Sequence, residues 1–361
     1  MSRMTIFCWM TSAADVSAAR FAKTGLWASF LFVIMVVSGL PGCDRGPAVH
    51  EFTGSTMGTR YHVKVIANEV PGAIEKGIYE ALDAVDRAMS TYQINSELNQ
   101  LNRQPLGQPF ALSDPLYEVL VHARQVYRET GGAFDPSIGP LVDLWGFGPA
   151  LERGGEVPAE ADIDELLSVL GYDGLSIDSE QRTATRNRAV RLDLSAIAKG
   201  YGADRAAAYL RQNGFDRFLV EVGGEMVLSG LNGQGRPWQV AIETPTPDRR
   251  TVQRVIGLSK GAVATSGDYR NYFEKDGVRY SHTLDPRDGY PIRHALASVT
   301  VIADNCAQAD ALATAFMVMG DQPTLAYAEE RDIPVFLLVK AGDGFVEQYS
   351  PAFGAYLQEV N

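Results

Sequence analysis

The stretch Leu192-Asp-Leu-Ser-Ala-Ile-Ala-Lys-Gly-Tyr-Gly-Ala-Asp204 joins the end of a strand-like apolar run to the beginning of a helix. Its pattern predicts that the helix begins near Ser195 or Ala196. Exposed backbone N–H groups and the positive end of the helix dipole at such a junction favour a phosphate, and Lys199 could pair with it. The stretch lacks the Gly-rich loop and the Gly-Lys-Ser/Thr of a P-loop. An ordinary capped helix with a solvated lysine is the alternative interpretation.

Strand-like and helix-like segments are interspersed on both sides of this junction. Short apolar runs predict strands at 61–66, 175–177, 189–193, 218–222, 225–229, 238–243, 252–258, 262–265, 297–302 and 335–339. Apolar residues at helical spacing predict helices at 71–90, 113–130, 160–170, 197–213 and 307–319. The Gly- and Pro-rich stretch 139–158 is expected to be a loop. This order favours an α+β fold, with largely antiparallel sheets and flanking helices, over a doubly wound parallel sheet.

The N-terminal segment has the pattern of a secretory signal. Arg20 and Lys23 precede the apolar run 26–40, which is shorter than the ~20 residues of a membrane-spanning helix. Leu40-Pro-Gly-Cys43 resembles a bacterial lipobox, which implies cleavage before Cys43 and lipidation of its thiol. The following Asp44 resembles the signal that retains lipoproteins at the inner membrane. An ordinary signal or an N-terminal anchor helix is the alternative.

The lipobox-like pattern defines the expected domain organisation. We expect residues 1–42 to be a signal peptide, 43–52 a tether and 53–361 a single domain. The protein is expected on the periplasmic side of the bacterial inner membrane, anchored by lipid. Its net charge of −12 opposes binding to nucleic acid and to anionic lipid headgroups. Of the three cysteines, Cys8 leaves with the signal and Cys43 is lipidated, so Cys306 has no partner for an intrachain disulfide.

Two glycine-containing segments are candidate ligand contacts. In Gly54-Ser-Thr-Met-Gly-Thr59, small residues before a strand let a backbone approach a ligand closely, and a simple strand-entry turn is the alternative interpretation. In Gly131-Gly-Ala-Phe-Asp-Pro-Ser-Ile-Gly-Pro140, two glycines end a helix and a carboxylate follows. The Asp-Pro pair there is also common in turns.

Two further segments contain groups suited to acid–base and metal chemistry. In Tyr280-Ser-His-Thr-Leu-Asp-Pro-Arg-Asp-Gly-Tyr-Pro291, Asp285 lies three residues after His282 and could orient it as a general base. On the helix at 307–319, Asp310 and Thr314 are one turn apart and offer two oxygens to a hard cation such as Mg²⁺. The alternative for Asp310 is compensation of the helix dipole.

The order and spacing of all five motifs resemble the ApbE family, the FAD:protein FMN transferases that flavinylate periplasmic proteins. The resemblance covers the chain from about Gly54 to Pro334. It implies His282 as the catalytic histidine and Asp288 where Thr is common, a departure near the phosphates. The FAD contacts that it implies are Met57, Tyr92, Ala133, Phe134, Asp135, Asp193, Lys199 and, through its backbone, Leu284. The Mg²⁺ ligands that it implies are Asp310, Thr314 and the backbone carbonyl of Ala196.

The resemblance also implies a reaction and its partners. FAD and a Thr or Ser hydroxyl of an acceptor protein would give phosphoester-linked FMN and AMP. Attack on a pyrophosphate requires charge neutralisation and in-line positioning more than covalent catalysis, which suits a cation, a lysine and a histidine base. The expected acceptors are flavin-bearing subunits of ion-pumping redox complexes. Two alternatives stay open: an FAD pyrophosphatase giving FMN and AMP, and a flavin-binding lipoprotein without turnover.

Overall fold

The computed structural model describes residues 47–148, 156–246, 251–269 and 271–357. Pro47–Asn361 form one compact unit. The signal sequence and Cys43 lie outside the described residues, so their roles stay predictions. No helix of the described ranges combines the length and the apolar character that a membrane crossing requires.

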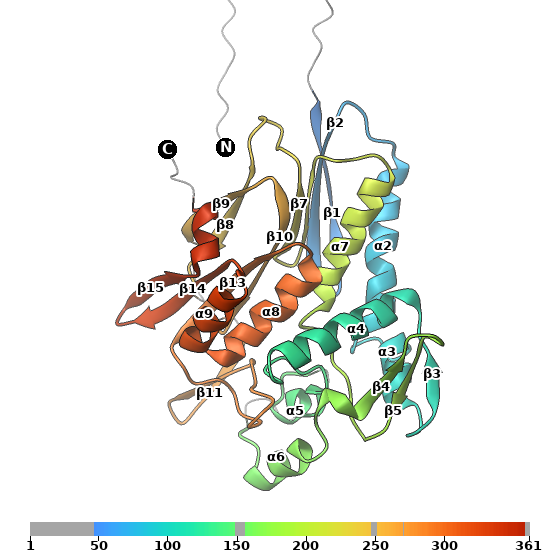
Figure 1. Cartoon of the computed structure of the whole chain (residues 1–361), viewed down its shortest axis with the longest axis vertical. Helices are drawn as coiled ribbons and strands as arrows, with labels where there is room; N and C mark the ends of the chain where they lie inside the picture. The colour runs from blue at the N-terminus through green and yellow to red at the C-terminus, as the bar shows by residue number, and fades with distance from the viewer. Residues whose placement is uncertain (1–46, 149–155, 247–250, 270, 358–361) are drawn as a thin grey trace, which may run out of the picture. The chain divides into compact units, whose positions relative to one another are not determined.

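An eight-stranded antiparallel sheet forms the centre of this unit (Figure 1). Its strands, in spatial order, are β1 (Ala48–Thr56), β2 (Thr59–Ala67), β6 (Phe218–Val222), β7 (Glu225–Ser229), β10 (Lys260–Gly267), β13 (Leu296–Ala303), β14 (Val335–Ala341) and β15 (Gly344–Tyr349). All neighbouring strands run antiparallel. The predicted α+β fold with antiparallel sheets is therefore confirmed.

The sheet is covered on both faces. The helices α2 (Ala73–Met89), α7 (Ala198–Gln212) and α8 (Cys306–Met319) form one layer, in which α7 contacts β6 and α8 contacts β10 and β13. The hairpin β8 (Trp238–Glu243) and β9 (Val252–Leu258) and the 3₁₀ helix η3 (Pro351–Tyr356) pack on the other face. Successive side chains of a strand point to opposite faces, so Val65 lies in the core beneath the helices and Ile66 in the other core.

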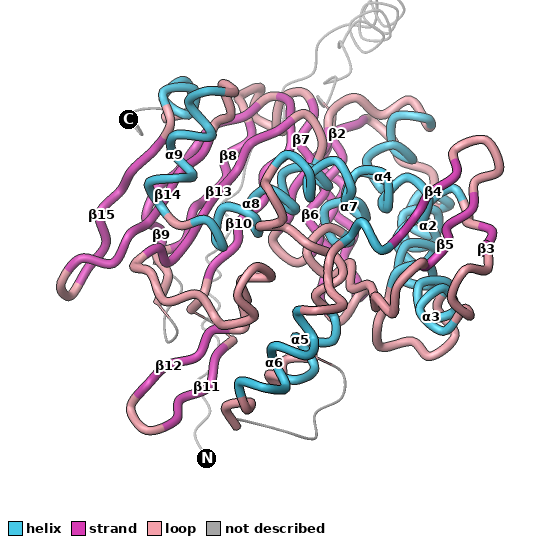
Figure 2. Tube along the Cα trace, turned by 60° about the horizontal axis from the view of Figure 1, so that its bottom comes forward, coloured by secondary structure: helices cyan, strands magenta, loops and turns pink. Residues whose placement is uncertain are grey.

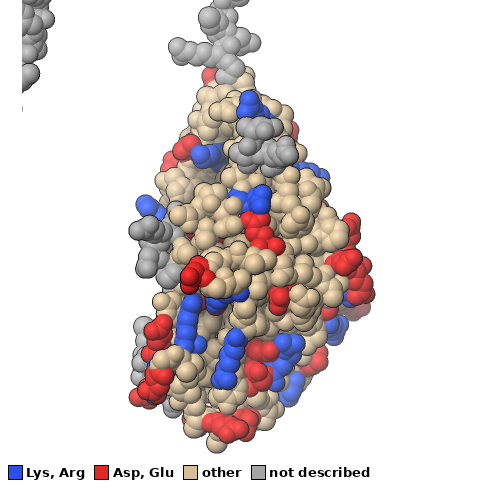
Figure 3. All heavy atoms as spheres, turned by 90° about the vertical axis from the view of Figure 1, so that its left-hand side faces the viewer, with Lys and Arg blue, Asp and Glu red and all other residues tan. Residues whose placement is uncertain are grey.

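The remaining elements surround this centre (Figure 2). The helices are α3 (Glu97–Arg103), α4 (Asp114–Glu129), α5 (Gly139–Leu144), α6 (Glu160–Leu167), α9 (Asp321–Glu330) and the 3₁₀ turn η2 (Tyr172–Gly174). A small sheet contains β3 (Pro109–Ala111), β5 (Thr183–Arg186) and β4 (Leu175–Asp178), and β11 (Tyr272–Lys275) and β12 (Val278–Ser281) form a hairpin. On the face shown in Figure 3, basic and acidic side chains are interspersed.

The predicted strand at 189–193 was wrong. The partner of β4 is β5, and the later segment makes only an isolated bridge between Ile138 and Arg191. The backbone N–H of Leu192 donates to Oδ1 of Asn102 at 2.8 Å, and its carbonyl accepts from Nδ2 of Asn102 at 2.9 Å. A side-chain amide from α3 therefore takes the bonds that a neighbouring strand would have supplied.

Three boundaries also differ from the predictions. The segment 139–158, expected to be a loop, begins with α5, because fully buried Leu141 and Trp145 pack with Ile163 and Leu284 in a separate core. β1 begins at Ala48, inside the segment expected to be a tether. Helix α7 begins at Ala198, within one residue of the range predicted from its apolar spacing but later than the Ser195 or Ala196 start predicted from the junction, because 195–197 form a turn.

Candidate active site

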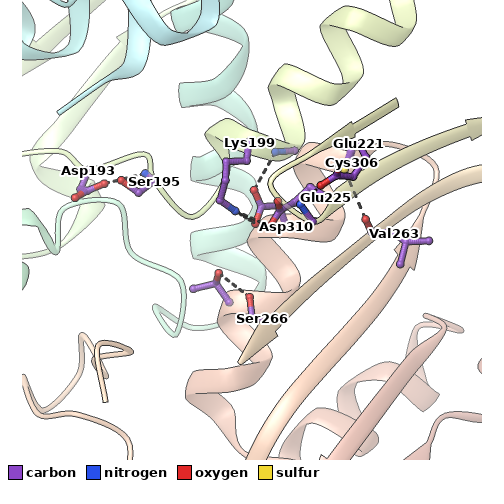
Figure 4. Close-up of polar contacts among 12 residues, drawn as sticks. Asp193, Ser195, Lys199, Glu221, Glu225, Val263, Ser266, Cys306 and Asp310 are labelled. Atoms are coloured by element: carbon purple, nitrogen blue, oxygen red, sulfur yellow. Dashed lines mark hydrogen bonds and ion pairs between the residues drawn. The ribbon is translucent and has the colours of Figure 1, made fainter. Parts of the chain in front are cut away.

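The N-terminal end of α7 and the first turns of α8 meet at three charged side chains (Figure 4). Lys199 donates from Nζ to Oε1 of Glu225 at 2.5 Å. The same Nζ lies 3.8 Å from Oδ1 of Asp310. The side chains of Glu225 and Asp310 are only 5% and 4% exposed. The ammonium and both carboxylates are thus held together largely out of water.

Gly200 allows α7 and α8 to approach closely at this cluster. A Cβ at this position would lie 2.3 Å from the carbonyl oxygen of Cys306 and 2.8 Å from Cβ of Asp310. The N–H of Gly200 donates to Oδ2 of Asp310 at 3.0 Å. Gly200 lies in the first turn of α7, where backbone N–H groups have no acceptor within the helix. The Asp310 carboxylate satisfies this N–H and joins α8 to the start of α7.

The surroundings of the cluster raise the pKa of both Lys199 and Glu225, for different reasons. Burial alone would lower the pKa of Lys199, but the carboxylates of Asp310 and Glu225 outweigh it and raise this pKa, so Lys199 stays protonated. Burial raises the pKa of Glu225 to about 7, against the opposing effect of Lys199. With all three groups ionised, the cluster carries one net negative charge, which favours the approach of a cation.

The oxygens around Asp310 fit a hard divalent cation. Its Oδ1 faces the Lys199 ammonium at 3.8 Å, which is longer than a hydrogen bond. Thr314 lies one helical turn further along α8, and its hydroxyl is 3.3 Å from Oγ of Ser266 on β10. Within the described residues, no three His, Cys, Asp or Glu side chains are grouped to hold a metal. The predicted ligand set instead combines one carboxylate with a hydroxyl and a carbonyl, as Mg²⁺ sites do.

The N-terminus of α8 is capped by other residues than Asp310. The side chain of Asn305 accepts from the N–H of Gln308 at 2.9 Å. The carboxylate of Asp204, from α7, accepts from the N–H groups of Cys306 and Ala307, each at 2.9 Å. Since the helix end is already compensated, its dipole does not account for Asp310, and the predicted ligand role is favoured.

His282 follows β12 and is half-buried. Its Nδ1 is 2.9 Å from the carbonyl oxygen of Asn271, which accepts and so fixes the proton on Nδ1 and leaves the lone pair on Nε2. Burial lowers the pKa of His282, and the ammonium of Lys199 acts in the same direction. The carbonyl of Asn271 and the carboxylate of Asp268 oppose the shift. His282 is therefore a neutral imidazole with a basic nitrogen, as a general base requires.

The predicted orientation of His282 by Asp285 was wrong. The carboxylate of Asp285 accepts from Nε and Nη2 of Arg287 at 2.8 and 2.6 Å, and it also accepts from the N–H of Arg287. The Asp285-Pro sequence closes a turn in which the N–H of Gly289 donates to the carbonyl of Asp285. Leu284 is buried and bridges to Pro291, so only its backbone is placed to meet a ligand.

Three of the residues that the resemblance assigns to FAD lie at turns or loops. Met57 occupies the β1–β2 turn with a left-handed φ of 48°, and its side chain lies against Gly202 of α7. Asp193 is half-buried, and its Oδ1 accepts from the N–H of Ser195 at 2.8 Å. Tyr92 is 71% exposed in the loop between α2 and α3.

The segment from Ala133 to Asp135 is buried. Phe134 belongs to the main core, and Oδ1 of Asp135 accepts from the N–H of Ser137 at 2.8 Å. Burial raises the pKa of Asp135, and the bond from Ser137 opposes this shift. The carbonyl of Pro136 accepts from the N–H of Asp193 at 2.7 Å. The two sequence motifs are therefore adjacent in space, as a common ligand would require.

The sequence-based prediction missed Glu225, Ser266 and the carbonyl of Asn271. Glu225 had a weak signal, because it follows Gly223 and Gly224 between two strand-like runs. Both glycines have a positive φ, at 63° and 110°, and form the tight β6–β7 turn that presents the glutamate. Ser266 and Asn271 belong to segments with no recognisable motif.

Comparison with known proteins identifies similar chains over nearly the whole length. The ApbE family model matches residues 57–337. A FAD:protein FMN transferase of Vibrio cholerae is 43% identical over 326 residues, which are 89% of this chain and 96% of that protein. The FAD:protein FMN transferase of Escherichia coli K12 is 35% identical over 350 residues, with 93% of this chain and 97% of that protein covered.

Solved structures show the same fold. The flavin transferase ApbE from Vibrio cholerae has a TM-score of 0.79 and 41% identity, with 86% of this chain and 100% of that chain covered. The apo form of the Pseudomonas stutzeri flavinyl transferase ApbE has a TM-score of 0.79 and 39% identity, with 86% of this chain and 97% of that chain covered.

Proposed function

The chain belongs to the ApbE family, and on that premise we propose that it transfers the FMN part of FAD to a hydroxyl of an acceptor protein. The new bond joins the acceptor oxygen to the phosphorus of FMN. The pyrophosphate P–O bond of FAD breaks, and AMP is released. The arrangement that supports this proposal best is the cluster of Lys199 from α7 and Asp310 from α8, with His282 close enough for the Lys199 ammonium to lower its pKa.

Each side chain has a role that its surroundings support. Nε2 of His282 accepts the proton of the acceptor Thr or Ser hydroxyl as its oxygen attacks, while Asn271 holds the ring by Nδ1. Lys199 stays protonated and adds positive charge at the pyrophosphate. Asp310, Thr314 and the carbonyl of Ala196 would hold Mg²⁺. The bound ion would supply polarisation of the phosphoryl oxygen and charge stabilisation of the leaving AMP.

The test is mass spectrometry of an acceptor protein co-expressed with this chain, with AMP quantified in a purified reaction. Transfer predicts the FMN mass on a Thr or Ser of the acceptor, AMP in equal amount, and loss of both on removal of Mg²⁺. Free FMN formed at the same rate without acceptor would instead indicate an FAD pyrophosphatase. Intact FAD after long incubation with Mg²⁺ and acceptor would indicate a flavin-binding protein and refute the proposal.

A lipid anchor at Cys43 on the periplasmic side of the inner membrane is part of the proposal. β1 begins at Ala48, and five residues span at most about 18 Å, so the start of β1 would be held close to the bilayer. The Met57 turn lies at the other end of β1, roughly 30 Å away. This turn is close to the active site, because Gly223 lies between Thr59, which follows the turn, and Lys199. A Cβ at Gly223 would be 2.8 Å from Cγ2 of Thr59 and 3.3 Å from Cδ of Lys199. The active site therefore lies toward the end of β1 that is farther along the chain from Cys43.

A further inference from the structure

We propose that Glu225 belongs to the cation site, where its Oε2 binds the divalent ion directly or through a water molecule of the ion's shell. The inference rests on the proposed function, because it concerns the same ion that Asp310 and Thr314 would hold. Glu225 is not among the residues that the family resemblance implies.

The two carboxylate oxygens of Glu225 have different surroundings. Oε1 accepts from Lys199 at 2.5 Å, whereas Oε2 is buried with no hydrogen-bond partner among the described residues. The side chain as a whole is 5% exposed. A buried carboxylate oxygen without a partner is costly, since it has lost its water and gained nothing in exchange. Beside the predicted ligand Asp310, an oxygen of this kind is available to bind an ion.

With Glu225 ionised, the charge of the cluster favours a cation as the ligand. Oε1 of Glu225 and Oδ1 of Asp310 lie 2.5 Å and 3.8 Å from the same ammonium, so the two carboxylates share a single positive charge from Lys199 (Figure 4). An anion at Oε2 would add to the excess negative charge. A neutral donor would leave that excess in place, whereas a divalent cation reverses it. With the diphosphate of FAD also present, both carboxylates help to balance Mg²⁺ and Lys199.

The backbone holds Glu225 firmly in this position. It is the first residue of β7, directly after the two left-handed glycines of the β6–β7 turn. The N–H of Gly224 donates to Oε1 of Glu221 at 2.7 Å, which stabilises the turn from the preceding strand. Because Mg²⁺ takes six oxygens in a nearly octahedral shell, a rigid additional carboxylate fits its requirements.

The experiment is a titration of the mature, FAD-free protein with Mn²⁺, with unbound Mn²⁺ measured by electron paramagnetic resonance. Glu225→Gln keeps an oxygen for Lys199 but removes the charge, and we expect its Mn²⁺ affinity to fall at least about tenfold. Glu221→Gln, a matched change two residues before the glycines, keeps an oxygen for the N–H of Gly224, so its Mn²⁺ affinity should stay close to that of the parent. Asp310→Asn serves as the reference for a lost ligand. Melting temperatures establish that each variant is folded, and Glu225→Asp, which keeps the charge, should recover part of the affinity.

The outcomes separate this inference from the proposed function. If Asp310→Asn weakens Mn²⁺ binding while folded Glu225→Gln binds like the parent, the role of Glu225 is refuted and the proposed function stands. If neither variant changes the affinity, or if the parent binds no Mn²⁺, the cation site itself is refuted. If Glu221→Gln loses as much affinity as Glu225→Gln, the effect comes from the turn, and the ligand role is again refuted.

Discussion

Replacement of His282 by Asn tests the proposed base directly. The imidazole uses Nδ1 to donate to the carbonyl of Asn271 at 2.9 Å, and only Nε2 is left to accept a proton. The Asn amide can still donate to that carbonyl, but it has no basic nitrogen. General base catalysis is typically worth 10²–10⁴-fold, so we expect FMN transfer to slow by at least about 10², or about 2.7 kcal/mol in the activation barrier.

The assay for His282→Asn is the single-turnover rate at saturating FAD and acceptor, together with FAD affinity measured by flavin fluorescence. FAD affinity should stay nearly unchanged, because the lost interaction belongs to the transition state. A loss of rate under about threefold would refute the base role, since Asn can replace a histidine that only makes a hydrogen bond. A large loss of FAD affinity would also contradict the base role and would indicate that His282 binds FAD.

The pH dependence of the parent enzyme provides a second test of His282. Burial lowers its pKa below the ordinary 6.5, so the imidazole stays neutral to a lower pH than a free histidine. As pH falls through this lowered pKa, the ring becomes protonated and cannot accept the hydroxyl proton. We therefore expect kcat/KM to decline on the acid side with an apparent pKa below 6.5. An acid limb that lies above 6.5, or that persists in His282→Asn, would contradict this assignment.

Three further changes test the site and the anchor. Asp310→Asn keeps an acceptor for the N–H of Gly200 but removes the charge, so FMN transfer at limiting Mg²⁺ should be lost, and full activity there would reject the ligand assignment. Gly200→Ala places a Cβ 2.3 Å from the carbonyl oxygen of Cys306 and should lower the unfolding free energy by about 1–3 kcal/mol in urea denaturation. The control Gly72→Ala has nothing within 4 Å of its Cβ and should leave the unfolding free energy nearly unchanged. Equal stabilities of the two variants would show that α7 and α8 do not pack so closely. Cys43→Ala should release the protein from membrane fractions or leave it unprocessed, and normal cleavage with unchanged membrane attachment would disprove lipidation.

Local patterns in the sequence were sufficient for most of the fold. Short apolar runs and helical spacing predicted most strands and helices of the central layers, though not β1, because the periodicity of an element decides which residues share a face. The i, i+4 spacing of Asp310 and Thr314 on α8 was likewise a property of the helix alone. The left-handed glycines at the end of α4 were recognisable because only glycine adopts that conformation readily.

Contacts between distant segments determined the features that local sequence patterns do not specify. The segment 189–193 was apolar enough for a strand, yet Asn102, distant in sequence, took its backbone bonds. Buried contacts of Trp145 stabilised a helix in a Gly- and Pro-rich stretch. The partner of His282 was a carbonyl eleven residues earlier in the chain rather than the adjacent Asp285. Glu225 is buried beside Lys199 only because the β6–β7 turn meets α7 and α8, and no single segment specifies such packing between elements.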